Sequence, residues 1–363
     1  MKAARFYDNK DIRIEDIEEP TAGAGEVLIK VAWAGICGTD LHEYLDGPIF
    51  CPTQHTPHPI SGETAPVTMG HEFSGVVEAL GEGITDLEVG DHVVVEPYIL
   101  DEDVETGPDN KNYHLSENMN FIGLGGRGGG LSEKVAVKRR WVHKISKDIP
   151  LDEAALIEPL TVGYHAVERA GKIKEGDVAL VGGAGPIGLL IAAVLKAYGA
   201  TVIMSELSSL RRQKALDAGV ADHALSPAEV DIVEEVKKLT DGRGADVAFE
   251  CTSVNVVLET LMDAIRPQGI IVVASIWGKP AQMDLHKLVL KEVDVRGTIA
   301  YVNNHPDTIK LVESGKVNLK PFITGRIPLE NLIDKGFDTL INHNETAVKI
   351  LVTTDPQRLA DAQ

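Results

Sequence analysis

Residues 177–206, read DVALVGGAGPIGLLIAAVLKAYGATVIMSE, constrain the fold more than any other part of this chain. An apolar run at 178–181 is broken by two glycines, an apolar run of helical length follows at 189–198, and a β-branched run leads to Glu206. This order predicts a strand, a Gly-rich turn, a helix and a second strand. Strands that alternate with helices build parallel sheets, so we expect an α/β fold.

The glycines of the spacing Gly183-x-Gly185-x-x-Gly188 have separate physical tasks. The first permits the tight turn, the second lets the backbone approach a pyrophosphate, and the third lets the helix pack closely on the strand. The pyrophosphate then accepts hydrogen bonds from N–H groups at the helix N-terminus, where the helix dipole is favourable. The sequence therefore predicts a dinucleotide site formed by Gly183, Gly185, Pro186, Ile187 and Gly188.

Glu206 stands at the position where a ribose-binding acid is expected, about 20 residues beyond the glycines. Its carboxylate would accept hydrogen bonds from a ribose diol and repel a 2′-phosphate, which favours NAD over NADP. Arg211 and Arg212 follow, and an arginine there can bind phosphate. We interpret them as residues at the start of a helix that cover the adenine face or are solvated, and we include Arg211 in the cofactor site.

Composition excludes several other classes of protein. The chain has 363 residues, long enough for two domains, and a formal net charge of −20, which opposes binding to nucleic acids or anionic membranes. Three cysteines form no disulfide framework. The first 20 residues lack the apolar core of a signal peptide, and the uncharged run 178–195 contains five Gly and Pro residues. We expect a soluble, cytoplasmic protein with a small-molecule substrate.

The hydrophobic period divides the chain into three stretches. Residues 1–155 predict mainly strands, with an irregular Pro-rich excursion at 46–66 and a Gly-rich loop at 123–130. Residues 156–299 alternate helices with six apolar strands, which predicts a doubly wound parallel (Rossmann) sheet. Residues 300–363 are mixed, and we expect them to return and complete the first domain. Expected strands outside the Rossmann sheet are 3–7, 12–16, 26–33, 73–80, 92–96, 131–137, 141–145 and 348–352, with helices at 306–315 and 329–341 and an extended segment at 321–326.

The first stretch contains candidate ligands for a metal. Hydride transfer from an alcohol to NAD needs a substrate that loses its proton near neutral pH, and a Lewis-acid metal lowers that cost. Cys37, the pair His71-Glu72, and Glu158 offer a thiolate, an imidazole and a carboxylate, a donor set typical of catalytic zinc. Because Glu158 precedes Pro159, we expect an extended backbone at Glu158 and Pro159 at the first helical position. Which of the two glutamates binds the metal at rest stays open.

Each candidate ligand has an ordinary structural interpretation, with Cys37 as a small buried residue and His71 as a hydrogen-bonded histidine at a strand edge. The metal interpretation is favoured because these residues occur together in a chain with an NAD fold. Cys51, His55 and His58 also have ligand spacing, but they lie in a Pro-interrupted segment without an obvious fourth ligand or open position, which disfavours a metal there.

Thr39 and His42 follow Cys37 and predict a proton route. The hydroxyl of Thr39 can accept the proton of the alcohol, and the imidazole of His42 titrates near pH 7 and could pass that proton to solvent through the cofactor ribose. The alternative for His42 is a surface histidine without a catalytic role.

These motifs together resemble the zinc-dependent medium-chain dehydrogenase/reductase superfamily over essentially the whole chain. The phrases CGTDLHEYLDGPIF (37–50), VTMGHEFSGVV (67–77) and WVHKI (141–145) resemble its (R,R)-2,3-butanediol dehydrogenase branch, with sorbitol dehydrogenases as close relatives. The resemblance implies a GroES-like catalytic domain of distorted β-barrel type, a homodimer or homotetramer, and interconversion of a vicinal diol and its hydroxyketone. It assigns catalytic zinc to Cys37, His71 and Glu158, with Glu72 as an exchanging ligand, and the proton relay to Thr39 and His42.

The chain departs from the family at 101–116, where many relatives carry four cysteines for a structural zinc. The segment reads DEDVETGPDNKNYHLS, so we expect one catalytic zinc per chain and no second, structural zinc. Two alternatives remain open. One is a polyol or L-threonine dehydrogenase on the same scaffold, and the other is a non-catalytic NAD(H)-binding protein.

Overall fold

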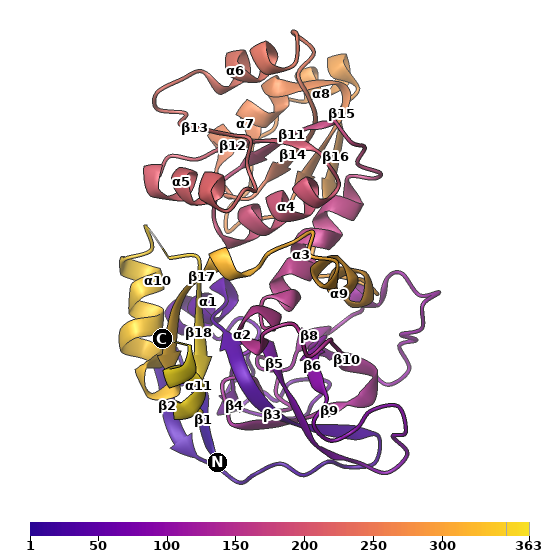
Figure 1. Ribbon diagram of the computed structural model, residues 1–363, viewed down its shortest axis with the longest axis vertical. Coiled ribbons are helices and arrows are strands. Elements are labelled where there is room, and N and C mark those ends of the chain that lie inside the picture. The colour runs from indigo at the N-terminus through magenta and orange to yellow at the C-terminus, as the bar shows by residue number, and fades with distance from the viewer. Residues whose placement is uncertain (346, 363) are drawn as a thin grey trace. The chain divides into compact units, whose positions relative to one another are not determined.

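A computed structural model describes residues 1–345 and 347–362, which fold as two compact units (Figure 1). The first unit contains Met1–Glu158, His305–Glu313 and Leu319–Gln363, and the second unit contains Pro159–Asn304 and Ser314–Asn318. The sequence divides the chain at 155/156 and 299/300. It assigns 300–363 to the first domain, whereas residues 300–304 and Ser314–Asn318 belong to the second unit.

The second unit is built on one six-stranded sheet in the order β13-β12-β11-β14-β15-β16. Its strands are β11 (Val178–Gly182), β12 (Thr201–Ser205), β13 (His223–Leu225), β14 (Ala245–Glu250), β15 (Ile265–Val273) and β16 (Asp294–Gly297). All neighbouring strands in it are parallel, which confirms the doubly wound sheet. The chain runs outward from β11 in both directions, so β11 and β14 flank the point where ligands bind in such sheets.

Helices connect the strands of this sheet as the alternating pattern predicts. They are α4 (Pro186–Ala197), α5 (Ser209–Asp217), α6 (Ile232–Leu239), α7 (Asn255–Ala264) and α8 (Leu285–Lys291), and a further helix, α3 (Ile157–Arg169), precedes β11. Every residue of β11 is buried, as is the run Gly188–Leu195 of α4. An apolar run of this kind is stable only when both faces of the sheet are covered.

The first unit is organised around a seven-stranded sheet in the order β10-β6-β5-β3-β18-β17, with β9 also paired to β3. Its strands are β3 (Glu26–Gly35), β5 (Glu72–Leu80), β6 (His92–Val95), β9 (Lys134–Lys138), β10 (Val142–Lys144), β17 (Ile323–Pro328) and β18 (Lys349–Thr353). Two small sheets accompany it, β2-β1-β4 and β7-β8. They contain β1 (Lys2–Asp8), β2 (Asp11–Asp16), β4 (Val67–Thr68), β7 (Tyr98–Ile99) and β8 (Asn120–Phe121). Strand β18 pairs with β3, so the C-terminal stretch completes the sheet that the N-terminal stretch begins.

The first unit also holds short helical segments. They are α1 (Gly38–Asp46), η1 (Tyr113–Leu115), η2 (Arg139–Trp141), α2 (Leu151–Ala154), α9 (His305–Glu313), η3 (Lys320–Phe322), η4 (Leu329–Asn331), η5 (Leu332–Phe337), α10 (Asp338–Asn342) and α11 (Pro356–Asp361). The single helix expected at 329–341 is instead a succession of 3₁₀, π and α turns. Gly336 permits this, because its missing side chain leaves room for the Ile36 side chain, which an added Cβ would meet at 2.6 Å.

The expectation about Glu158 was wrong. Glu158 and Pro159 are the second and third residues of α3, so Glu158 is helical and not extended. A proline is tolerated throughout the first turn of a helix, because the N–H groups there need no partner within the helix. The preference of the preceding residue for extended backbone is a bias that tertiary packing overrides.

Two further boundaries differ from the sequence-based expectations. The strand expected from 131 begins only at Lys134. Ser132 ends the Gly-rich loop, where its hydroxyl donates to the carbonyl oxygens of Gly129 and Lys134 at 2.8 and 2.9 Å. None of the helices in the described parts of the chain is long and apolar enough to cross a membrane.

Candidate active site

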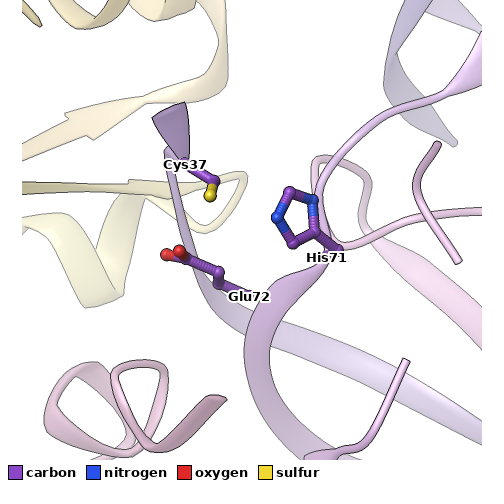
Figure 2. Close-up of side chains that lie close together, drawn as sticks. All are labelled: Cys37, His71 and Glu72. Carbon is purple, nitrogen blue, oxygen red and sulfur yellow. The ribbon is translucent and has the colours of Figure 1, made fainter. Parts of the chain in front are cut away.

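Strand pairing in the first unit brings three candidate ligands together. Cys37 follows β3 and His71 immediately precedes β5, and these two strands pair with Gly35 opposite Glu72. Cys37, His71 and Glu72 each offer a ligand atom, and these atoms lie within 4.8 Å of one another. Figure 2 shows the sulfur and the imidazole facing a common space, while the carboxylate of Glu72 points away from the ring of His71.

Asp40, which sequence reasoning missed, supports both Cys37 and His71. It is completely buried in the first turn of α1, and its Oδ2 accepts a hydrogen bond from the backbone N–H of Cys37 at 2.9 Å. Its Oδ1 lies 3.6 Å from Nδ1 of His71. Burial raises the pKa of Asp40 to about 6, although His71 opposes the rise. A carboxylate behind a metal-binding histidine orients the ring and raises its basicity.

Lys349, also missed, holds the carboxylate of Glu72. Its Nζ lies 2.8 and 2.6 Å from the two oxygens of Glu72 and donates to the carbonyl of Ile36 at 3.1 Å. Both side chains are almost fully buried. Burial opposes the charged ammonium, but Glu72 and Cys37 raise the pKa of Lys349 above its usual value. Both oxygens of Glu72 are therefore engaged by a buried cation.

Glu158 is buried in α3, and its charge acts on this cluster. Burial alone would lower the pKa of His71. The negative charges of Cys37, Asp40 and Glu158 outweigh it, and they raise that pKa well above its usual value. The cluster thus gathers one thiol and three carboxyl groups, those of Asp40, Glu72 and Glu158, around the cationic side chains of Lys349 and His71. This surplus of negative charge and the mixed sulfur, nitrogen and oxygen donors fit a zinc ion.

The two residues of the predicted proton route lie on α1 beside the cluster. Thr39 is half-buried, with its Oγ1 3.7 Å from Sγ of Cys37. His42 is exposed and lies three residues further along the same helix, so both side chains are on one face.

The Gly-rich turn of the second unit has the backbone shape that a dinucleotide site needs. Gly183 has φ +99°, and Gly185 precedes α4 with Pro186 at its first position. A Cβ on Gly188 would lie 2.1 Å from the carbonyl oxygen of Gly183, whereas a Cβ on Gly185 would meet nothing within 4 Å. Gly188 is therefore required by packing, and Gly185 leaves open space beside the helix N-terminus. Ile187 follows Pro186 in the first turn of α4.

Glu206 lies one residue beyond β12 and is held by backbone donors. Its Oε2 accepts from the N–H of Ala184 at 2.8 Å, and its Oε1 accepts from the N–H of Ser208 at 2.9 Å. The acid is thus tied directly to the Gly-rich turn. Arg211 lies in the first turn of α5, where its backbone N–H donates to the Ser208 hydroxyl at 3.3 Å.

The second set of possible ligands at 51–58 is used in other ways. Burial raises the pKa of the Cys51 thiol well above its usual value, with Glu43 acting in the same direction. Nδ1 of His58 accepts from the backbone N–H groups of Ile60 and Ser61 at 3.2 and 3.1 Å. His55 is exposed, and these three residues form no ligand cluster within the described residues.

The sequence carried a partial signal for one of the two missed residues. Asp40 follows Cys37 by three residues, the spacing at which a side chain reaches back to the backbone N–H before a helix. Lys349 had no such signal. It lies 277 residues from Glu72 and reaches it only because β18 returns to pair with β3.

Fold and site together define a zinc-binding alcohol dehydrogenase with a Rossmann domain for its nucleotide. Two family models match the chain, an alcohol dehydrogenase GroES-like domain at residues 23–147 and a zinc-binding dehydrogenase at 186–314. The chain is 68% identical to an (R,R)-butanediol dehydrogenase of Neisseria gonorrhoeae, over 97% of this chain and 99% of the relative.

Solved structures agree. The crystal structure of 2R,3R-butanediol dehydrogenase from Bacillus subtilis matches with a TM-score of 0.91 and 45% identity, over 98% of this chain and 99% of that one. An alcohol dehydrogenase of Escherichia coli in complex with NADH matches with a TM-score of 0.82 and 26% identity, over 97% and 99%.

The chain belongs to the zinc-dependent medium-chain dehydrogenase/reductase superfamily, and it is an oxidoreductase with zinc and NAD as cofactors. The expected GroES-like domain beside a Rossmann domain is confirmed.

Proposed function

We propose that the chain interconverts a vicinal diol and its hydroxyketone, with 2,3-butanediol and acetoin as the substrate pair and diacetyl as a further substrate for reduction. The observation that carries the proposal is the full-length similarity to the (R,R)-butanediol dehydrogenase of N. gonorrhoeae, in a chain that brings Cys37, His71 and Glu72 together. When bound, zinc would polarise the substrate oxygen and NAD would accept the hydride.

Cys37, His71 and Glu158 are the ligands we propose for zinc. Glu72 is instead a positioning residue, because Lys349 engages both oxygens of its carboxylate at 2.8 and 2.6 Å. Its release from Lys349 would be needed before it could replace Glu158. Asp40 fixes the Cys37 backbone through its hydrogen bond and lies behind the ring of His71.

Thr39 and His42 are the residues we propose for proton movement. The hydroxyl of Thr39 lies next to the sulfur of Cys37, so it can accept the proton of a substrate alcohol that lies at the ligand cluster. His42 is one turn further and exposed, so its imidazole can exchange that proton with solvent. Gly183, Gly185, Pro186, Ile187 and Gly188 would hold the pyrophosphate, with Glu206 on the adenosine ribose and Arg211 beside it.

Substrate preference is tested by NADH oxidation with acetoin, diacetyl, fructose and dihydroxyacetone in parallel, followed by chiral analysis of the products. We expect acetoin and diacetyl to have the highest kcat/KM. A higher kcat/KM for fructose would establish a polyol dehydrogenase, and turnover of none of the four by zinc-loaded protein would favour a non-catalytic NAD(H) binder.

We also propose that the protein is a cytoplasmic homodimer or homotetramer. Its three cysteines are free in the structure, which fits a reducing compartment. Light scattering coupled to size-exclusion chromatography would give the assembly, and a monomer at micromolar concentration would contradict this part of the proposal.

A further inference from the structure

A second group of potential ligands lies in the first unit, apart from the candidate active site. Glu96, His143 and His305 each offer a ligand atom, and these atoms lie within 4.8 Å of one another. Glu96 and His305 are completely buried, and His143 is partly buried. We propose that these three side chains form a second metal site, which takes Zn²⁺ or a similar first-row divalent ion and ties α9 to the sheet.

Strand pairing places the first two ligands on one face of the sheet. His143 lies opposite Val94 in the pairing of β10 with β6, and the backbone N–H of Glu96 donates to the carbonyl of Trp141 at 2.8 Å. Because side chains alternate along a strand, Glu96 shares a face with Val94 and His143 shares one with Trp141. Nε2 of His143 lies 3.0 Å from Oε2 of Glu96.

The third ligand, His305, comes from the short segment His305–Glu313, which belongs to the first unit although it is far from the rest of that unit in the sequence. His305 is the first residue of α9, and the residues on either side of α9 belong to the second unit. Its ring stacks on that of His143, with centroids 5.1 Å apart and an angle of 12° between the planes. Ligands 96, 143 and 305 are far apart in sequence, so an ion bound to all three would cross-link three segments of the fold.

The surroundings of the ligands have the features of a metal site. The hydroxyl of Tyr113 donates to Oε1 of Glu96 and leaves Oε2 on the side of His143. Two imidazoles and one carboxylate are a common donor set for zinc.

Arg140 is the main opposing feature, because a cation near Glu96 competes with a metal. Its Nη1 lies 3.4 Å from Oε2 of Glu96, which is long for a hydrogen bond. Its other nitrogens donate to Thr106, with Nη2 2.7 Å from the carbonyl oxygen, and its guanidinium lies 4.5 Å from the centroid of the Trp141 ring. Arg140 therefore keeps its stronger contacts when an ion takes its place beside Oε2.

Of the three proposed ligands, His143 borders a cavity. This cavity of about 380 Å³ is lined by His143 together with Arg140, Pro306 and Ile309. Tetrahedral zinc places its ligand atoms roughly 3.3 Å apart, so atoms that lie up to 4.8 Å apart must close by up to about 1.5 Å. His143 is partly exposed and can make that adjustment. The same carboxylate also anchors Tyr113, so the ion would brace the cysteine-free segment 101–116 from its base.

The number of zinc ions bound per chain, in the wild type and in ligand variants, tests this proposal. The full chain is loaded with Zn²⁺, excess ion is removed by gel filtration, and zinc is measured by plasma mass spectrometry. We expect about two ions per wild-type chain and about one in His143→Gln and in His305→Gln, since each removes one of three ligands. His286→Gln, at an exposed histidine in α8, is the matched control and should retain both ions.

Cobalt distinguishes the two sites. In protein loaded with Co²⁺, the thiolate charge-transfer band reports the Cys37 site, and it should persist in His143→Gln while part of the ligand-field absorption is lost. If the wild-type chain binds one ion, and both variants also bind one, the proposal is overturned. Glu96, His143 and His305 would then be a hydrogen-bonded cluster without a metal. If either variant fails to fold, anomalous diffraction at the zinc edge from wild-type crystals decides. A peak between Glu96, His143 and His305 supports the site, and its absence from zinc-loaded crystals overturns it.

Discussion

The ligand cluster around Cys37 and the Gly-rich turn at 183–188 are built by different physical means. The cluster is assembled from side chains of distant segments, is buried, and carries more negative than positive charge. The turn is one contiguous segment, and its function depends on backbone φ values and on the absence of Cβ atoms. The first region should therefore respond to changes of charge and donor atoms, and the second to added volume.

The largest expected effect comes from removing a donor atom at the cluster. In Cys37→Ser, a hydroxyl replaces the thiolate ligand, and we expect kcat to fall on the order of 10³-fold, about 4 kcal/mol in the barrier. NADH binding, followed by fluorescence titration, should persist because the turn lies in the other unit. Cys51→Ala, at a buried thiol outside the cluster, is the control. Full activity of Cys37→Ser, or full activity of the wild-type protein after its metal has been removed, would contradict the zinc assignment.

Removing the cation of the cluster should mainly affect stability. Lys349→Met leaves the carboxylate of Glu72 buried without its partner, and we expect a loss of about 3 kcal/mol in the free energy of unfolding. Urea denaturation measures it. The double variant with Glu72→Gln removes both charges and should recover most of the loss, as a double-mutant cycle would show. A double variant no more stable than Lys349→Met would mean that packing, and not charge, governs this position.

The same contrast explains what the sequence could predict. The turn at 183–188 is contiguous, so its spacing alone predicted the strand, the helix and the positions of the glycines. Cys37, His71 and Glu158 were predicted as ligands because few residue types bind zinc and because an NAD-binding fold needs a group that activates the alcohol. Lys349 has no local signal, since its role exists only after β18 has paired with β3.

Local rules failed where tertiary packing decides. The rule for a residue before proline predicted extended backbone at Glu158, yet α3 begins one residue earlier. The periodicity of 329–341 predicted one helix, but Gly336 lets side chains of the sheet approach and the chain forms 3₁₀, π and α turns. His305 was unremarkable in the sequence, because nothing in its neighbours indicates that it meets Glu96 and His143.

In the turn, Gly188→Ala should disturb the fold by volume alone. The added Cβ would lie 2.1 Å from the carbonyl oxygen of Gly183, so helix and strand must separate. We expect a loss of about 2 kcal/mol in the free energy of unfolding. Urea denaturation with and without NADH would show it, and an unchanged midpoint in both conditions would refute the packing role of this glycine.

Gly185→Ala should separate cofactor binding from stability, with the smallest effect of the series. Gly185 has φ −72°, which alanine adopts readily, and its added Cβ meets no protein atom within 4 Å. Stability should stay unchanged, while the methyl group occupies the space assigned to the pyrophosphate and raises the KM for NAD about tenfold, or about 1.4 kcal/mol. Gly297→Ala, at another open glycine of the same unit, is the control and should leave the KM unaltered. An unchanged KM for NAD in Gly185→Ala would mean that the pyrophosphate binds elsewhere. The turn would then not differ from the ligand cluster in depending on open space where the cluster depends on charge.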